Sequence, residues 1–307
     1  MNLNEIEALI SISRLGNVTR AAGRLNRSQP AITRRIKLLE RRLGAPLIER
    51  SRGGVVLTEA GRCFLSYAEA GLAAFKDGVE AVKALQGQER GIVSLAVVGT
   101  LAATTLVDQL KRFARMHKGV QLELHTANSQ EVGELVRRAE VGFGLRYFGD
   151  SSPNLVSQQI SRERMVVACA PEHRWAGRRV RDPRRLREDR WVAFPVARTR
   201  RDSLAHLVLR QLTAAHLDSA KILEIDSLTA QKRLVEAGFG IALVPESSIQ
   251  EELRLGTLEV IDVPALRADV PIFLVYRRQG YLSGAARALL SLMAKVPVKP
   301  RNPRQRQ

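Results

Sequence analysis

Polar side chains between residues 29 and 37 have the types and the spacing to read the edges of DNA bases. On a helix that begins at this point, one face presents Gln29, Thr33, Arg34 and Lys37. A glutamine amide can pair with adenine, an arginine guanidinium with guanine, and a threonine can contact the thymine methyl group. We therefore expect this helix to lie in the major groove of duplex DNA.

Further basic side chains around this face are candidates for contacts with phosphate, which give affinity rather than specificity. They are Arg20, Arg35, Lys37, Arg41 and Arg42. After the helix, the sequence RSRGGVVLT has an extended piece on each side of two glycines, which is typical of a hairpin, or wing. Arg50 and Arg52 on or beside this hairpin could enter the minor groove or contact phosphate, and each could equally be a solvated charge on a turn.

Two short helices must position these side chains. Their apolar inner faces are Ala21, Ala22 and Leu25 in the first helix and Ala31, Ile32, Ile36 and Leu39 in the second. Asn26-Arg27 supply the turn, Ser28 is the expected N-cap of the second helix, and Pro30 falls in its first turn. Small alanines allow the helices to cross closely, so the pattern predicts a helix-turn-helix. The alternative is an ordinary solvated helix face.

A longer helix is expected from Thr58, its N-cap, to about Leu85. Its apolar residues recur three or four apart, at Leu65, Ala68, Leu72, Phe75, Val79, Val82 and Leu85. A single apolar stripe with nothing else to pack on favours a dimer interface, and a core helix within one domain is the alternative. The polar, glycine-flanked residues 86–91 are typical of a hinge.

Beyond the hinge, short apolar runs alternate with helical patterns. Strands are expected at 92–98, 120–126, 141–146, 164–169, 190–194, 221–225, 240–244 and 271–276, and helices near 103–116, 129–139, 203–215, 228–237 and 283–294. This alternation predicts an α/β unit with mostly parallel strands, long enough for two subdomains with a cleft between them. The basic, proline-rich end of the chain has little to bury and is expected to be disordered.

The charge of the chain favours a polyanionic partner. Its 307 residues contain 49 Lys and Arg against 31 Asp and Glu, a net charge of +18, which alone does not separate DNA from RNA or from an anionic membrane. Cys63 and Cys169 lie far apart without CxxC spacing, so the sequence supports neither a disulfide framework nor a zinc cluster, and a reducing cytoplasm fits. The first residues lack the pattern of a secretion signal, and no apolar stretch reaches the roughly 18 residues of a membrane helix. We expect no cofactor.

The chain resembles the LysR-type transcriptional regulators. The resemblance rests on ALISISRLGNVTRAAGRLNRSQPAITRRIKLLERRLGAPLIERSRGGVVLTEAG at 8–61 and VEAGFGIALVP at 235–245, with VVACAPEHRWAG at 166–177 as a weaker similarity. It implies a winged helix-turn-helix, a dimerising linker helix and a two-lobed effector domain similar to periplasmic binding proteins. It also implies homodimers and homotetramers on an interrupted palindrome, bent promoter DNA, a small-molecule effector and contact with RNA polymerase.

The same resemblance implies a domain plan. It places a winged helix-turn-helix DNA-binding domain at 1–58, a linker helix at 59–86, a hinge at 87–91, an effector-binding domain at 92–297 and a flexible basic tail at 298–307. Lobe I of the effector-binding domain would comprise about 92–161 and 267–297, and lobe II about 162–266.

Site residues follow from the matching positions. Base contacts are implied for Gln29, Pro30 and Arg34, with Ser28 and Thr33 nearby. The wing departs from the family pattern, because this chain has Gly53 where an arginine is frequent and Arg52 one place earlier.

Effector contacts are implied between the lobes, for a small anionic or aromatic ligand. The matching positions are Thr100, Asn128, Thr199 and Ser227. Arg146, at the end of a strand that would face the cleft, could pair with a ligand carboxylate. Thr100 and Asn128 could equally be helix N-caps. The third strand, GFGLRY, lacks the aspartate that similar proteins often carry near its start.

Residues 174–201 contain eleven arginines. They could form a secondary anion surface that meets bent DNA or a phosphorylated effector, and the alternative is a solvated loop.

Competing functions find less support in the sequence. Enzyme motifs such as HExxH and GxSxG are absent, and the pair Cys169 and His173 lies on an apolar run where inert buried thiols are common. A redox-sensing regulator would need its cysteines to meet, and Cys63 falls in the linker helix. A solute-binding protein would need a signal peptide. An effector-independent regulator of the same family remains open.

Overall fold

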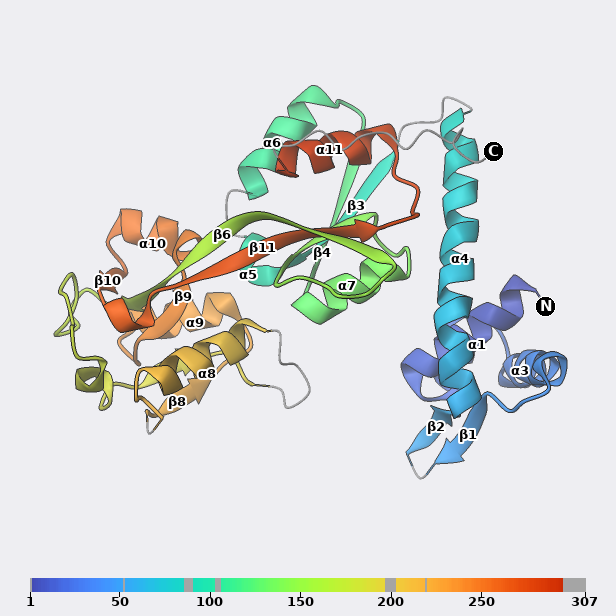
Figure 1. Cartoon of the computed structure of the whole chain (residues 1–307), viewed down its shortest axis with the longest axis horizontal. Helices are drawn as coiled ribbons and strands as arrows, with labels where there is room; N and C mark the ends of the chain where they lie inside the picture. Colours follow the sequence, from blue (N-terminus) through green and yellow to red (C-terminus); the bar gives the residue numbers. More distant parts are fainter. Residues whose placement is uncertain are drawn as a thin grey trace. The chain divides into compact units, whose positions relative to one another are not determined.

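The computed structural model describes residues 2–51, 53–85, 91–102, 106–196, 203–218 and 220–294. The chain forms two compact units. Unit 1 comprises Met1–Gly87 with Arg137–Ala139, and unit 2 comprises Gln88–Val136 with Glu140–Gln307 (Figure 1). The expected disorder of the basic tail concerns residues outside the described part of the chain.

Unit 1 begins with three helices around a small apolar core, followed by a hairpin and a long helix. Its elements are α1 (Leu3–Leu15), α2 (Val18–Arg24), α3 (Gln29–Leu43), β1 (Ile48–Ser51), β2 (Gly54–Leu57) and α4 (Glu59–Leu85). A capping box starts α1, because Asn2 Oδ1 accepts from Glu5 N at 3.0 Å and Glu5 Oε2 accepts from Asn2 N at 3.1 Å. The predicted helix-turn-helix and hairpin are both present.

The two inner faces predicted for the helix-turn-helix make the core of this unit. Ala21 and Ala22 are buried together with Ile32, Ile36 and Leu39, and Leu9 of α1 lies in the same cluster. Small side chains at Ala21 and Ala22 let α3 cross α2 closely, as the sequence pattern required.

The long helix α4 begins after Thr58, whose hydroxyl accepts from Gly61 N at 3.0 Å, so the predicted N-cap is confirmed. Its predicted apolar stripe divides into two parts. Ala68, Leu65 and Leu72 pack against Ile6 and Ile10 of α1, in the same unit. Phe75, Val79 and Val82 are instead exposed. The core-helix interpretation therefore holds for the first half of α4. In the second half, Phe75, Val79 and Val82 are not buried against the described residues of unit 1.

Unit 2 is built on a seven-stranded sheet with the order β10-β6-β11-β5-β3-β4 and β9 paired to β6. Its strands are β3 (Ile92–Val98), β4 (Gln121–Ala127), β5 (Phe143–Tyr147), β6 (Leu155–Cys169), β9 (Ala242–Pro245), β10 (Glu259–Ile261) and β11 (Ala268–Arg277). A separate parallel pair is formed by β7 (Trp191–Ala193) and β8 (Ile222–Glu224).

The prediction of mostly parallel strands is wrong for the large sheet. Within the described residues, four of its six strand pairings are antiparallel. The reason is topological: β6 leaves the β3-β4-β5 end of the unit and β11 returns beside it in the opposite direction, so both of these long strands span the unit (Figure 1). The predicted strand at 164–169 is only the final part of β6.

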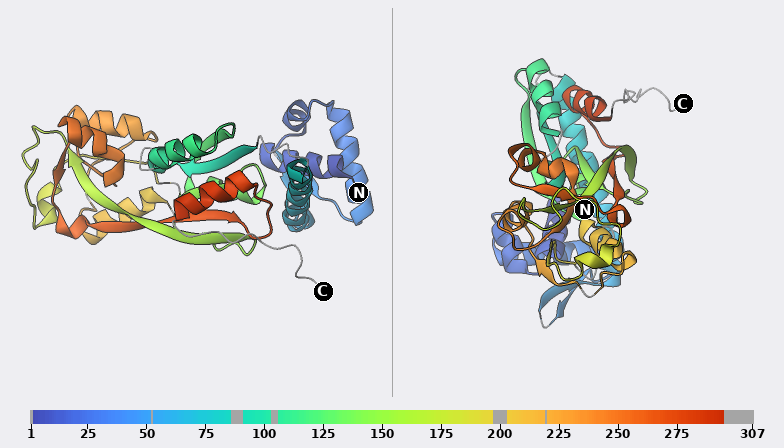
Figure 2. Two further views of the ribbon diagram at one scale, coloured as in Figure 1. Left: turned by 90° about the horizontal axis from the view of Figure 1, so that it is seen from above. Right: turned by 90° about the vertical axis from the view of Figure 1, so that its left-hand side faces the viewer.

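Helices cover both faces of the β3-β4-β5 end, and α6 and α11 lie side by side on one of them (Figure 1, Figure 2). The helices of this unit are α5 (Gly99–Ala102), α6 (Leu106–Met116), α7 (Ser129–Arg137), α8 (Leu204–Ala214), α9 (Leu228–Glu236), α10 (Gln250–Leu255) and α11 (Gly284–Ala294), with the 3₁₀ turns Pro183–Leu186, Glu246–Ile249 and Pro264–Leu266. No helix in the described residues is long and apolar enough to cross a membrane.

Candidate functional site

The helix α3 presents an exposed polar edge at its N-terminal end. Gln29 and Arg34 are exposed and Thr33 is partly exposed, whereas Ile32 and Ile36 are buried. Ser28 occupies the N-cap position, and its carbonyl oxygen accepts from Ile32 N at 3.2 Å. Its hydroxyl makes no capping hydrogen bond, so the predicted capping role of the Ser28 side chain is wrong. The hydroxyl lies on the exposed surface instead.

The basic residues around this edge fall into different environments. Arg20, Lys37 and Arg50 are exposed on α2, α3 and β1. Arg52 lies outside the described residues. Arg42, a predicted phosphate contact, donates from Nη1 to Glu5 Oε2 at 3.1 Å. Because Glu5 is buried, this ion pair ties α3 to α1, and Arg42 serves the fold of unit 1.

The hairpin is attached to α3 by a carboxylate that sequence reasoning missed. Glu40 Oε1 accepts from Leu47 N at 2.8 Å and from Ile48 N at 3.3 Å, so the last turns of α3 hold Leu47 and the first residue of β1. Gly61 permits a second close approach, since a Cβ there would lie 2.0 Å from Leu47 O. An acidic residue near the end of an otherwise basic helix was the available signal.

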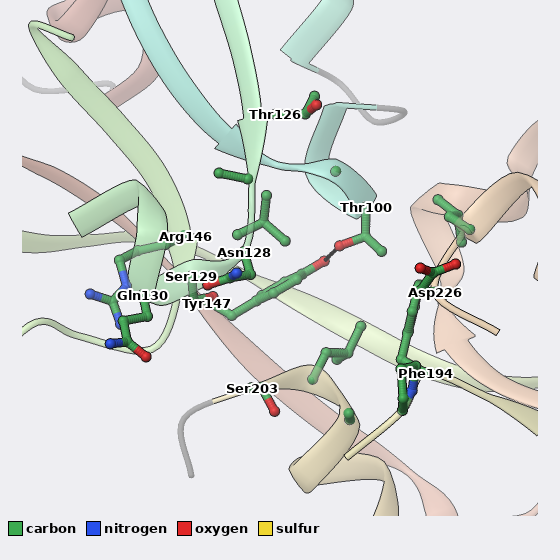
Figure 3. Close-up of a pocket in the computed structure, with 17 residues that line it drawn as sticks. Thr100, Thr126, Asn128, Ser129, Gln130, Arg146, Tyr147, Phe194, Ser203 and Asp226 are labelled. Carbon is green, nitrogen blue, oxygen red and sulfur yellow. Dashed lines mark hydrogen bonds between the residues drawn. The ribbon is translucent and has the colours of Figure 1, made fainter. Parts of the chain in front are cut away.

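A cavity of about 560 Å³ lies in unit 2 beside the carboxyl ends of β3, β4 and β5 (Figure 3). Polar residues lining it are Thr100, Thr126, Asn128, Ser129, Gln130, Arg146, Tyr147, Ser203 and Asp226, and apolar ones include Phe194, Pro195, Leu204 and Leu228. The lining comes from residues 98–147 and from residues 194–228, the segments before and after β6, as expected for a cleft between two lobes.

A buried hydroxyl pair lies in this cavity. Thr100 Oγ1 donates to Tyr147 Oη at 3.0 Å, and both residues are buried (Figure 3). Burial raises the pKa of Tyr147 well above its ordinary value, so the phenol is neutral at physiological pH. The sequence prediction included Thr100 and missed Tyr147.

Arg146 lines the cavity, but its charge is already paired. Its guanidinium forms an ion pair with Asp150, whose Oδ1 also accepts from Ser152 N at 3.0 Å. Gly133 of α7 lies against this pair, because a Cβ there would be 2.4 Å from Asp150 Oδ2. Figure 3 shows the Arg146 side chain pointing toward Gln130 and away from Thr100 and Asp226. The chain itself thus neutralises the cation that was expected to meet a ligand carboxylate.

Three helices begin at the cavity. Asn128 caps α7, accepting from Glu131 N at 3.1 Å, which confirms the N-cap alternative for this residue. Ser203 caps α8, accepting from His206 N at 3.3 Å, and Ser227 caps α9, accepting from Ala230 N at 3.4 Å. Ser227 does not line the cavity, whereas its neighbours Asp226 and Leu228 do. Thr199 lies outside the described residues.

Cys169 does not have the surroundings of a reactive nucleophile. Cys169 is buried, and desolvation raises the pKa of its thiol to about 12. Its Sγ lies 3.6 Å from Glu259 O, while His173 accepts from Trp175 N and lies 3.4 Å from Asp189, so the two residues have separate partners. Cys63 is exposed on α4 of unit 1.

Family models match both units. A model described as the bacterial regulatory helix-turn-helix protein of the lysR family matches residues 3–62. A second, the LysR substrate binding domain, matches residues 86–297.

Characterised proteins are similar along most of the chain. The HTH-type transcriptional regulator TfdS of Cupriavidus pinatubonensis (strain JMP 134 / LMG 1197) is 29% identical over 279 residues, covering 90% of this chain and 92% of the relative. The RuBisCO operon transcriptional regulator of Allochromatium vinosum is 28% identical over 290 residues, 94% of each chain.

Solved structures share the fold. The crystal structure of CbnR, a LysR family transcriptional regulator, superposes with a TM-score of 0.64 at 24% identity, over 97% of this chain and 100% of that chain. CbnR in complex with its target DNA gives a TM-score of 0.62 at 24% identity, over 96% and 99% of the two chains.

Proposed function

The chain belongs to the LysR family of DNA-binding transcriptional regulators, and we propose that it is a regulator whose DNA binding is controlled by a small anionic effector in the cavity of unit 2. The exposed polar edge of α3 carries the DNA-binding half of this proposal. Ser28, Gln29, Pro30, Thr33 and Arg34 would read base edges, and Arg20, Lys37, Arg50 and Arg52 would contact phosphate.

The assembly that we propose follows the family. A dimer formed through α4 would place two α3 helices on the halves of an interrupted palindrome, and two dimers would form a tetramer. CbnR has been solved with its target DNA, which supports duplex DNA as the partner. We also propose the cytoplasm as the location and RNA polymerase as a partner on the promoter.

Within unit 2, we propose a boundary near residue 161 between lobe I and lobe II, with the effector between them. The three helix N-termini carry the proposal of an anion, because the unpaired N–H groups and the dipole of a helix favour negative charge at its N-terminus. These are the N-termini of α7 from lobe I and of α8 and α9 from lobe II. Thr100 and Tyr147 supply hydroxyls beside them. Arg146 would position α7 through its pair with Asp150 rather than bind the ligand directly.

The DNA-binding half is tested by footprinting the full-length protein on the DNA that flanks its own gene. We expect protection over an interrupted palindrome, lost in Arg34→Ala and kept in Arg112→Ala, which removes an exposed arginine from α6. Absence of any protected palindrome would contradict this part of the proposal.

The effector half is tested by thermal shift with small aliphatic and aromatic carboxylates, each paired with the amide of the same shape. A bound carboxylate at about 100 times its Kd should stabilise the protein by about 2.7 kcal/mol. We expect a rise in Tm for one carboxylate, none for its amide, and a smaller rise in Thr100→Val. Equal shifts for acid and amide would exclude an anion as the recognised group.

A further inference from the structure

A short segment of lobe II accounts for the net positive charge of the described part of unit 2. This arginine segment, residues 172–190, has four acidic residues and eight arginines, Arg174, Arg178, Arg179, Arg181, Arg184, Arg185, Arg187 and Arg190. Its net charge is +4. The described residues of unit 2 between 91 and 294 have 24 Lys and Arg against 21 Asp and Glu, a net charge of +3. The rest of the unit is therefore close to neutral.

Most of these arginines have no carboxylate to neutralise them. Ion pairs join Arg174 to Asp189 at 3.0 Å, Arg179 to Asp262 at 3.5 Å and Arg184 to Asp182 at 3.0 Å. The other five make no ion pair with any carboxylate in the part of the chain that the structure describes: Arg178, Arg181, Arg185, Arg187 and Arg190. All eight side chains are exposed.

Backbone hydrogen bonds join this segment to the rest of the lobe. Val180 N donates to Asp262 O at 2.8 Å and Gly177 N donates to Val260 O at 3.1 Å, which joins the segment to β10 and the residue after it. Trp175 lies beneath two guanidinium groups, with Arg174 6.0 Å and Arg185 5.8 Å from its ring centroid. An ordered scaffold thus presents a cluster of uncompensated cations to solvent.

The chemistry of the arginine segment fits phosphate better than a protein partner. The planar fork of a guanidinium matches the oxygens of a phosphate. Protein interfaces usually have an apolar centre, whereas no large apolar side chain between 172 and 190 is exposed. We propose that the arginine segment is a second DNA-binding surface, which contacts backbone phosphates outside the base pairs read by α3. This inference rests on the DNA binding of the family.

The test compares salt dependence between two matched triple variants of the full-length protein. The first, Arg178→Gln/Arg181→Gln/Arg185→Gln, removes three charges from the arginine segment. The control, Arg162→Gln/Arg164→Gln/Arg254→Gln, removes three exposed arginines from β6 and α10. Affinity is measured by fluorescence anisotropy over a series of KCl concentrations, on random-sequence duplexes of about 20 and about 60 base pairs. The longer duplex offers phosphates beyond the reach of α3.

On the longer duplex, the slope of log K against log salt should become shallower in the first variant by about 0.9 for each phosphate that the arginine segment no longer neutralises. The control and the wild type should have the same slope. Arg178→Lys/Arg181→Lys/Arg185→Lys, which keeps the charge, should restore most of the slope and separates loss of charge from loss of folding. Equal slopes in the two glutamine triple variants would overturn this inference, would leave the proposed function standing, and would favour an acidic protein as the partner of the arginine segment. Failure of the wild type to bind any duplex would overturn the proposed function as well.

Discussion

The Arg34 side chain is exposed on α3. Ile32 and Ile36, two residues before and after it in the sequence, are buried on the core-facing side of the same helix. If the Arg34 guanidinium pairs with a guanine, Arg34→Ala should weaken binding to the specific site by about 1–3 kcal/mol and relax the preference at one base pair. Lys37→Ala, a matched loss of one charge, should weaken binding to all duplexes alike. Competition binding with single base-pair substitutions measures both effects. An equal loss on every duplex for Arg34→Ala would assign this residue to phosphate.

Cys169 illustrates how burial controls reactivity at a single residue. Desolvation favours the neutral thiol, which raises its pKa from 9.0 to about 12. The folded chain therefore keeps this proton at pH values where the unfolded chain releases it, and the resulting stabilisation is complete below about pH 9 and is lost as the pH rises toward 12.

We expect maleimide at pH 8 to label Cys63 and to leave Cys169 unmodified in the native protein. Mass spectrometry of the wild type, Cys63→Ser and Cys169→Ala measures this directly, and unfolding in denaturant should expose both thiols. Rapid labelling of native Cys169 would contradict the burial argument and revive the redox-sensing alternative.

At the scale of elements, Glu40 connects α3 to the hairpin. Glu40→Ala removes the acceptor of two backbone N–H groups, from Leu47 and Ile48, and should cost about 1–3 kcal/mol of unfolding free energy. Glu40→Gln keeps an acceptor oxygen and should lose less. Thermal unfolding gives the stability, and DNA affinity should fall further than stability alone explains, because the wing loses its attachment. A Tm of Glu40→Ala equal to that of the wild type would show that these hydrogen bonds contribute little.

Elements with strong periodicity were predictable from the sequence. The apolar spacing of Ile32, Ile36 and Leu39 placed α3 correctly, and the mostly apolar run at 92–98 has the same bounds as β3. The short helix α10 was missed, since six residues are too few to establish a helical period. The antiparallel return of β11 was missed because pairing depends on distant partners.

The candidate site was predictable only in part, for a related reason. Consecutive residues of a strand point to opposite faces. Because all five residues of β5 are buried, the sequence did not indicate whether Arg146 or Tyr147 contributes its polar group to the cavity. The partner of Arg146 was equally hidden, since the turn that returns Asp150 to it is not a local sequence signal. Helix caps such as Asn128 were accessible, because capping depends on neighbouring residues.

At the scale of the whole molecule, charge is distributed beyond the DNA-binding unit. Residues 1–87 have 14 Lys and Arg against 8 Asp and Glu, a net charge of +6, and residues 88–307 have 35 against 23, a net charge of +12. Two thirds of the net charge therefore lies outside residues 1–87. If the slope of log K for DNA binding against log salt is no steeper than the phosphate contacts of α2, α3 and the hairpin explain, this charge has no role in DNA binding.

The exposed half of α4 should determine the assembly. Phe75, Val79 and Val82 lie on one stripe of the helix and are 54%, 40% and 55% exposed, although the hydrophobic effect favours their burial. If a second α4 covers them, Val79→Glu should place a buried charge in the interface and convert the dimer to monomers. Each monomer would then bind one half of the palindrome independently. Because the two binding events are no longer linked, DNA affinity should fall by orders of magnitude. Lys76→Glu, off this stripe on the same helix, should leave the dimer intact. Light scattering measures the mass of each variant, and a dimeric Val79→Glu protein would place the interface elsewhere.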